Sequence, residues 1–309
     1  MSTVIKCFLA LALYCAMLAQ AGTLALVADL NGRYGSTDYH PRIGEAVAAI
    51  IKLQPEAVVI AGDMIAGQVK PPLAHTRLDA MWASFERLVH RPLRAAGIRV
   101  LAVPGNHDAS IYPAYAGERR AYDEYWRPYK PDGLSEGSNF PWYYGVELTS
   151  ATLVGLDVTA PADLSPEQVE FLRRQREAAV AADRKLVVVT HLPRYPVAVG
   201  RERETFTGNP TPLPGEVWIS GHHHAFYAGL TPDGGLQLSL PPLGGNRRAW
   251  LGSSDRGPFG FVTLTPDGTI ALHADPSYEA ATAGVGPAEI GMLKRTNSPS
   301  RHTNAVNSD

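Results

Sequence analysis

The chain has 309 residues, which is enough for one large domain or two modest ones. Hydrophobic residues make up 45% of it, so a sizeable core needs no disulfides. The formal net charge at pH 7 is -2, and without a basic excess the composition gives no nucleic-acid-binding signature.

The first 21 residues differ from the rest of the chain and predict a secretory signal peptide. Lys6 is the only charged residue among them, residues 7–19 form an apolar run, and Ala19-Gln20-Ala21 fits an A-x-A cleavage site. The run is shorter than the roughly 20 residues of a membrane span, and an uncleaved anchor is the alternative interpretation. We therefore expect an exported protein, periplasmic or secreted, with no membrane span in the mature chain.

Both cysteines, Cys7 and Cys15, lie inside this expected signal peptide. The mature chain would therefore contain no thiol and form no disulfide. No thiolate would be present to act as a metal ligand or as a nucleophile, so any metal site would use oxygen and nitrogen ligands.

Short apolar runs alternate with helical patterns directly after this segment. Strands are predicted at residues 24–28, 57–61 and 98–103, and helices at residues 41–53 and about 77–96. Thr76 is the predicted N-cap of the second helix, and Gly97 is its predicted stop. Strands that alternate with helices predict right-handed crossovers and a parallel sheet.

The rest of the chain predicts a second set of strands with one helix. Residues 110–141 are rich in Tyr, Pro and Gly and predict a long surface excursion over the site, an ordered lid. Its aromatic residues line a substrate pocket or pack over the edge of the core, and packing is the favoured interpretation. After it we expect a hairpin at 143–148 and 152–156, a helix at 165–182, strands at 185–189 and 217–220, and short strands within 225–274. We expect one domain over residues 22–276 and a disordered tail at 277–309.

Five short polar motifs each follow an apolar run directly. They are Asp29-Leu30-Asn31, Gly62-Asp63, Gly105-Asn106-His107-Asp108, Thr190-His191 and Gly221-His222-His223-His224. Asp, Asn and His are metal-ligand types, and the carboxyl ends of strands are where α/β proteins bind ligands. A single Asp or His at a strand end is more often a helix cap or a hydrogen-bonded loop residue. Five such motifs in order predict a metal site.

In order and type these motifs resemble those of the calcineurin-like metallophosphoesterases, whose pattern is D-x-H, G-D, G-N-H-[DE], a lone His and G-H-x-H. The resemblance covers residues 29–274 and implies an α/β fold: two mixed β-sheets packed as a sandwich and flanked by helices, in a four-layer αββα arrangement. It implies hydrolysis of a phosphomonoester or phosphodiester by metal-bound hydroxide. The implied cofactors are two divalent ions (Mn, Fe or Zn), and the implied partner is a small-molecule phosphate ester.

The resemblance also implies a role for each motif residue. The metal ligands would be Asp29, Asn31, Asp63, Asn106, His191, His222 and His224. Asp63 would bridge the ions, Asp29 and His224 would hold the first ion, and Asn106, His191 and His222 would hold the second. The catalytic residues would be His107, beside the substrate and the leaving group, and Asp108, which would orient the motif. His223 would face away.

Asn31 departs from the family pattern, which has His at this position. Three outcomes are open at this position. Asn31 ligates through its carbonyl oxygen and favours a harder ion such as Mn, or the ligand is instead Tyr34, Tyr39 or His40. In the third, the first metal site is weak or empty. The alternatives to a dinuclear enzyme are therefore a mononuclear phosphodiesterase and a metal- or phosphate-binding pseudoenzyme. The acidic residue usual after Gly-Asp is also missing, so another group must position His107.

One further segment contains groups that suit an anion. Gly244-Gly245-Asn246-Arg247-Arg248 offers the amides of a glycine-rich turn and two guanidinium groups. A solvated turn between strands is the alternative interpretation. The sequence does not separate the two.

Overall fold

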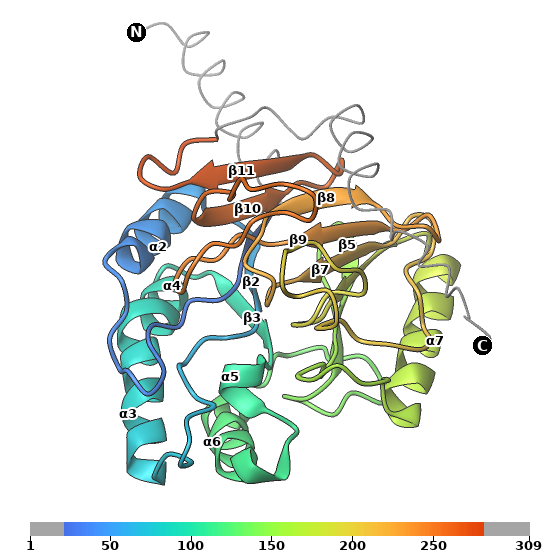
Figure 1. The fold of residues 1–309 in the computed structure, drawn as a ribbon. Helices are drawn as coiled ribbons and strands as arrows, with labels where there is room; N and C mark the ends of the chain where they lie inside the picture. The colour runs from blue at the N-terminus through green and yellow to red at the C-terminus, as the bar shows by residue number, and fades with distance from the viewer. Residues whose placement is uncertain (1–21, 281–309) are drawn as a thin grey trace, which may run out of the picture.

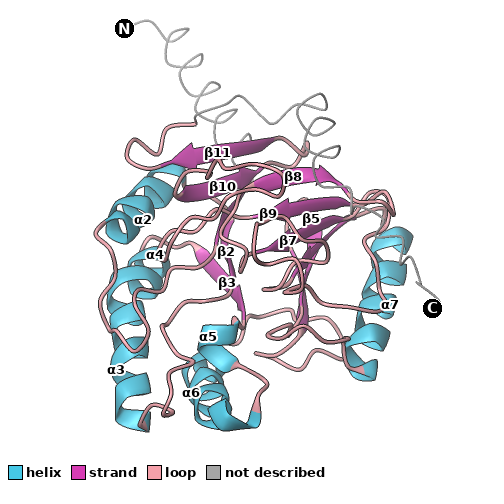
Figure 2. Ribbon diagram, viewed as in Figure 1, coloured by secondary structure: helices cyan, strands magenta, loops and turns pink. Residues whose placement is uncertain are grey.

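The structure, a computed structural model, describes residues 22–280 and folds them into four layers with two sheets inside and helices outside (Figures 1 and 2). The first sheet has the order β11 (Ile270–Ala274), β10 (Gly260–Leu264), β1 (Leu24–Val27), β2 (Ala57–Ala61) and β3 (Arg99–Val103). The second has the order β4 (Tyr144–Glu147), β5 (Ala151–Gly155), β6 (Lys185–Val189), β7 (Val217–Ser220), β9 (Leu236–Ser239) and β8 (Tyr227–Leu230). The expected four-layer αββα fold is confirmed.

Both sheets are mixed, with a parallel centre and antiparallel edges. In the first sheet β1, β2 and β3 are parallel, whereas β10 and β11 add antiparallel strands beside β1. In the second sheet β5, β6, β7 and β9 are parallel, and β4 and β8 are antiparallel edge strands. The parallel strands of each sheet therefore have their carboxyl ends on the same edge.

Helices cover the outer face of each sheet (Figure 1). The helices α2 (Arg42–Leu53), α3 (His75–Phe85) and α6 (Ala116–Trp126) contribute buried side chains to one core with the first sheet. The helix α7 (Pro166–Ala181) does the same for the second sheet, and Ser165 caps its first turn by accepting a hydrogen bond from the Gln168 N–H.

Side chains alternate between two cores along each central strand. In β1, Leu24 and Leu26 pack between the sheets, whereas Ala25 and Val27 face α2 and α3. The strand β6 does the same, with Val187 and Val189 between the sheets and its other buried residues against α7. A strand covered on both faces needs apolar residues at every position, which is why these strands are continuous apolar runs in the sequence.

The helix expected at about 77–96 differs in two ways. It begins at His75 with Ala74 as the N-cap, so Thr76 does not cap it, and a π-helical turn (Glu86–His90) separates α3 from α4 (Arg91–Ala95). Pro92 follows this turn and has no N–H to donate to an α-helical partner. The wider turn also directs the buried His90 ring inward, where Nδ1 lies 2.7 Å from the hydroxyl oxygen of Tyr125.

The expectation of a lid at residues 110–141 is wrong for most of that segment. It contains α6, whose residues Tyr122 and Trp126 are 0% and 1% exposed and pack against α3. Of this segment, Tyr112 lines the cavity described below. Most of the aromatic residues of this segment therefore pack in the hydrophobic core.

The packed part of the chain extends past the expected domain boundary at residue 276. Tyr278 is buried, and its hydroxyl donates a hydrogen bond to the Arg42 carbonyl at 3.0 Å. The expected signal peptide (1–21) and residues 281–309 of the expected tail lie outside the described residues. Between residues 22 and 280 no helix is both long and apolar enough to span a bilayer.

Replacing Trp126 by Ala tests the packing of α6. Because the indole is fully buried against Phe85 and Tyr122, we expect Trp126→Ala to lower the free energy of unfolding by about 3–5 kcal/mol. The matched control is Tyr112→Ala, an aromatic residue of the same segment that is 50% exposed, and it should change stability little. Urea denaturation measures both. Equal effects of the two substitutions would contradict the assignment of α6 to the core.

Candidate metal centre

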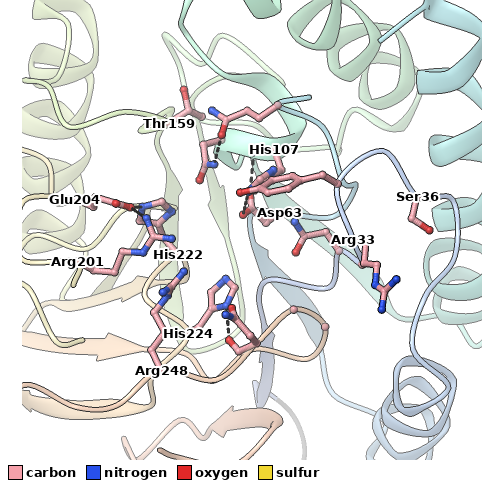
Figure 3. A pocket seen from close by; sticks show the side chains of 18 of the residues that line it. Arg33, Ser36, Asp63, His107, Thr159, Arg201, Glu204, His222, His224 and Arg248 are labelled. Atoms are coloured by element: carbon pink, nitrogen blue, oxygen red, sulfur yellow. Dashed lines mark hydrogen bonds and ion pairs between the residues drawn. The ribbon is translucent and has the colours of Figure 1, made fainter. Parts of the chain in front are cut away.

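The five polar motifs meet at one edge of the sandwich. They follow β1, β2 and β3 of the first sheet and β6 and β7 of the second, so they come from the carboxyl ends of parallel strands in both sheets. Backbone bonds join the loops: the Asp29 N–H donates to the Gly62 carbonyl at 3.1 Å, and the Gly221 N–H donates to the His191 carbonyl at 3.0 Å. Figure 3 shows the side chains facing a common cavity.

Four of the predicted ligands have left-handed backbone conformations that side-chain-bearing residues seldom adopt. The φ angles are 54° at Asp29, 56° at Asp63, 63° at His222 and 52° at His224. Each such residue costs about 1 kcal/mol or more, and strain of this kind is concentrated at functional sites. Glycine also makes room: a Cβ on Gly105 would lie 2.2 Å from the Asp63 Oδ1 atom.

Five of the seven predicted ligands form two groups that share Asp63. One group is Asp63, His191 and His222, and the other is Asp29, Asp63 and His224. Within each group one ligand atom per residue lies within 4.8 Å of the others. This division matches the two expected ions bridged by Asp63.

The surroundings of Asp63 favour its ionised form. The carboxylate is buried, which by itself raises its pKa, but His191, His107 and the His107 N–H together outweigh burial and hold the pKa well below its ordinary value. Among the histidines, burial acts to lower the pKa of His191, and the Asp63 carboxylate more than offsets it and raises this pKa to about 9. Without a metal ion, the buried Asp63 carboxylate and the His191 imidazolium each stabilise the charged form of the other.

Lone pairs converge between His191, Asn106 and Asp63, and this observation tests whether a cation fits. The His191 Nδ1–H donates to the Ala61 carbonyl at 2.8 Å, so a neutral ring has no proton on Nε2. That Nε2 lies 2.9 Å from the Asn106 Oδ1 and 3.3 Å from the Asp63 Oδ1. Three lone pairs can face one another in this way if the His191 ring is protonated or if a cation lies between them. The nitrogen and two oxygens present fit a divalent metal ion.

Gln68 fixes the orientation of the Asn106 amide. The Asn106 Nδ2 donates to the Gln68 Oε1 at 2.9 Å, so the carbonyl oxygen of Asn106 faces His191. Glu118 in turn holds the Gln68 backbone, because its carboxylate accepts the Gln68 N–H at 2.7 Å. Neither Gln68 nor Glu118 was predicted from the sequence.

The structure also separates the alternatives for the position of Asn31. Asn31 is 6% exposed and lines the cavity, and its Oδ1 is buried without a hydrogen-bond partner among the described residues. Tyr39 instead donates its hydroxyl to the Met64 carbonyl at 2.6 Å, and the ring of His40 contacts Arg42. Tyr34 is 69% exposed. A buried oxygen with free lone pairs is suited to a cation, so Asn31 is the candidate ligand.

His107 is positioned by Gly67, in place of the missing acidic residue. The His107 Nδ1–H donates to the Gly67 carbonyl at 2.9 Å, and the Gly67 N–H donates to the His107 carbonyl at 3.1 Å. The His107 Nε2 then faces the centre, 3.9 Å from the Asp63 Oδ2. Gly67 is needed because a Cβ there would lie 2.2 Å from the His107 carbonyl oxygen.

Asp108 does not line the cavity, and its contacts suit the orienting role that was expected of it. Its buried carboxylate accepts the N–H groups of Met64 (2.7 Å), Ile65 (2.9 Å) and Gly105 (2.9 Å). Burial and the nearby Asp63 raise the pKa of Asp108, and the donors at Ile65 and Gly105 oppose them. Asp108 is a positioning residue that joins the second and third motifs.

The two histidines next to each other in the last motif have different surroundings. The His222 Nε2 lies 2.8 Å from the Glu204 carboxylate, which leaves Nδ1 as the nitrogen for a metal ion. His223 is fully buried and contacts the Val197 N–H and the Glu204 carbonyl, so it faces away as expected. Glu204 was missed because it lies in an irregular segment with no strand before it.

The site opens into a cavity of about 1050 Å³. Besides Asn31, Asp63, Asn106, His107, His222 and His224, its lining includes Arg201, Glu204 and Arg248. Asp29 and His191 lie beneath the lining and are fully buried. The centre is therefore open on one side to a ligand and closed on the other by protein.

Two solved phosphatase structures have a fold similar to that of this chain. Among solved structures, the chain is similar to a dimetal phosphatase from Danio rerio, with 16% identity, a TM-score of 0.56, and 82% of this chain and 96% of that chain covered. It is also similar to the purple acid phosphatase PPD1 from yellow lupin (Lupinus luteus) seeds, with 15% identity, a TM-score of 0.59, and coverage of 85% and 53%. At these identities the likeness shows the fold alone.

No curated protein matches the sequence. The model of the calcineurin-like phosphoesterases matches residues 22–226, which is well over half of the chain and includes all five motifs up to His224. The chain belongs to the calcineurin-like phosphoesterase family.

Proposed function

We propose that this protein is a metal-dependent hydrolase of phosphate esters with two divalent ions at the centre. The observation that carries the proposal is the pair of ligand groups that share the Asp63 carboxylate at the floor of an open cavity. Asp29, Asn31, Asp63 and His224 would hold one ion, and Asp63, Asn106, His191 and His222 the other. When bound, such ions lower the pKa of water and neutralise charge on the phosphoryl group.

The protein contributes a general acid at His107. Because Gly67 holds its Nδ1–H, the Nε2 is the atom that faces the cavity and exchanges a proton. A protonated Nε2 would donate its proton to the leaving oxygen of the ester and stabilise negative charge on the phosphoryl group. We also propose export of the protein, on the basis of the sequence of residues 1–21.

Asp63→Asn tests the proposal directly. Removing the shared charge should release both ions and lower kcat/KM by about 10³-fold or more, because each ion contributes several kcal/mol to the transition state. We would measure metal content per chain, and hydrolysis of p-nitrophenyl phosphate and bis-p-nitrophenyl phosphate with Mn²⁺. Asp132→Asn removes the same charge from an exposed position and is the control. If the parent protein binds one ion or none and hydrolyses neither ester with any metal, the pseudoenzyme interpretation holds instead.

Asn31 gives a second prediction. Asn31→Ala removes the unpartnered oxygen and should reduce bound metal from two ions towards one, whereas Asn31→His should keep two ions and shift the preference from Mn²⁺ towards Zn²⁺. Metal titration followed by elemental analysis measures both effects. His40→Ala tests the competing ligand. Loss of an ion in His40→Ala but not in Asn31→Ala would show that the histidine is the ligand.

Gln68 gives a third prediction, because it orients the Asn106 amide. Gln68→Ala should weaken metal binding at the His191 site by about 10- to 100-fold, the usual effect of losing the partner of a ligand. Gln68→Glu keeps an acceptor oxygen for the Asn106 Nδ2 and should bind metal nearly as the parent does. The left-handed backbone of residue 68 is equally strained in both variants, so local strain cancels in the comparison. Equal metal affinities in the two variants would rule out this role.

A further inference from the structure

Among residues 22–280, two guanidinium groups at the cavity, those of Arg33 and Arg248, have no hydrogen-bond or ion-pair partner, and that of Arg248 is half-buried. Arg201 forms an ion pair with Glu204, which also contacts His222. Arg42 pairs with Asp275, and Arg33 is exposed to solvent. The half-buried Arg248 makes no side-chain hydrogen bond or ion pair within residues 22–280, and its Nε is shielded from solvent.

The position of Arg248 relative to the metal centre is fixed by its loop. The Gly244 N–H donates to the Asp29 carbonyl at 2.6 Å, and the Gly245 N–H donates to the Asn31 carbonyl at 2.9 Å. The Arg248 N–H donates to the His224 carbonyl at 3.1 Å. The loop is therefore tied to three predicted metal ligands, and Arg248 lies beside the His222 and His224 side of the cavity in Figure 3.

No carboxylate forms an ion pair with Arg248 among residues 22–280. Burial lowers the pKa of Arg248 and the positive charge of Arg201 lowers it further, whereas Glu204, Tyr34 and Asp29 act in the opposite direction without offsetting these two effects. A partly buried cation beside a like charge is unfavourable unless an anion joins them. Both arginines line the same cavity as the metal centre, so the compensating anion is one that enters with the ligand.

The neighbouring Arg247 has different contacts. It is exposed, donates to the Gly257 carbonyl at 3.3 Å, lies over the Phe259 ring at 5.1 Å, and does not line the cavity. Of the two guanidinium groups that the sequence offers for an anion, the structure therefore selects Arg248.

We propose that Arg248, beside Arg201, binds a charged oxygen of the phosphoryl group and makes the site selective for phosphomonoesters over phosphodiesters. This inference rests on the proposed function. A monoester carries one more negative charge and one more free oxygen than a diester does, and Arg248 is one uncompensated cation with forked donors. A diester places an uncharged substituent on that oxygen and leaves the guanidinium unpaired.

The experiment compares Arg248→Gln with the matched control Arg247→Gln, which removes the same charge one residue away. For Arg248→Gln, kcat/KM should fall about 10- to 100-fold on p-nitrophenyl phosphate and less than about threefold on bis-p-nitrophenyl phosphate, the loss expected for one charge-assisted hydrogen-bonded pair. Arg248→Lys should recover part of the loss. Arg247→Gln should match the parent on both esters.

Binding of inorganic phosphate to the Mn²⁺-treated protein, measured by calorimetry, is independent of turnover. Its affinity should fall by a similar factor in Arg248→Gln and stay unchanged in Arg247→Gln. Equal losses on the two esters, or unchanged phosphate affinity in Arg248→Gln, would overturn the inference. A loss confined to ligands with a second phosphate, such as pyrophosphate, would overturn it too. If no ester is hydrolysed by any form, the proposed function fails, and phosphate binding alone decides the role of Arg248.

Discussion

The buried carboxylate of Asp63 is the interaction on which the site depends. Its oxygens are the only ligand atoms common to both metal groups among the described residues, and they lie where the carboxyl ends of the two sheets meet. A bare carboxylate in this position would be strongly destabilising. His191, the His107 N–H and, when present, divalent cations supply the compensating charge and hydrogen bonds.

The loops around the site have strained backbone conformations. Four ligand residues adopt left-handed backbones, and Gly67 and Gly105 allow contacts that no Cβ would permit. The Asp108 carboxylate accepts three backbone N–H groups and so holds two of these loops together beneath the centre. The fold is thus most regular in its apolar cores and least regular where charged groups must converge.

Charged side chains also line the opening of the cavity. Glu204 pairs with Arg201 and contacts His222, whereas the half-buried Arg248 has no such partner among the described residues and is available to a ligand. Within one site, then, negative groups at the floor suit metal ions, and a positive group at the rim suits the anion that those ions would attract. The two features have the same physical origin, because a buried charge is stable only beside its opposite.

The sequence by itself determined the layers and the set of candidate ligands. Continuous apolar runs predict strands covered on both faces, and a polar motif directly after a strand lies at the sheet edge whatever the rest of the chain does. The structure brings Asp29, Asp63, His191 and His222 together at that edge, and their role as metal ligands stays a prediction. The π-helical turn and the buried helix α6 were not, because both depend on aromatic packing between distant segments.

Only the tertiary structure decided which loop residues contact the candidate ligands or line the cavity. Gln68, Glu204 and Arg248 lie in irregular segments, where no periodicity indicates which way a side chain points. Arg247 and Arg248 are adjacent and chemically identical, and their different positions follow from the hydrogen bonds that the loop makes with the first and last motifs. Strand ends are set by local pattern, whereas loop contacts are set by long-range packing. This is why the sequence indicates the candidate metal ligands but not the groups that orient them.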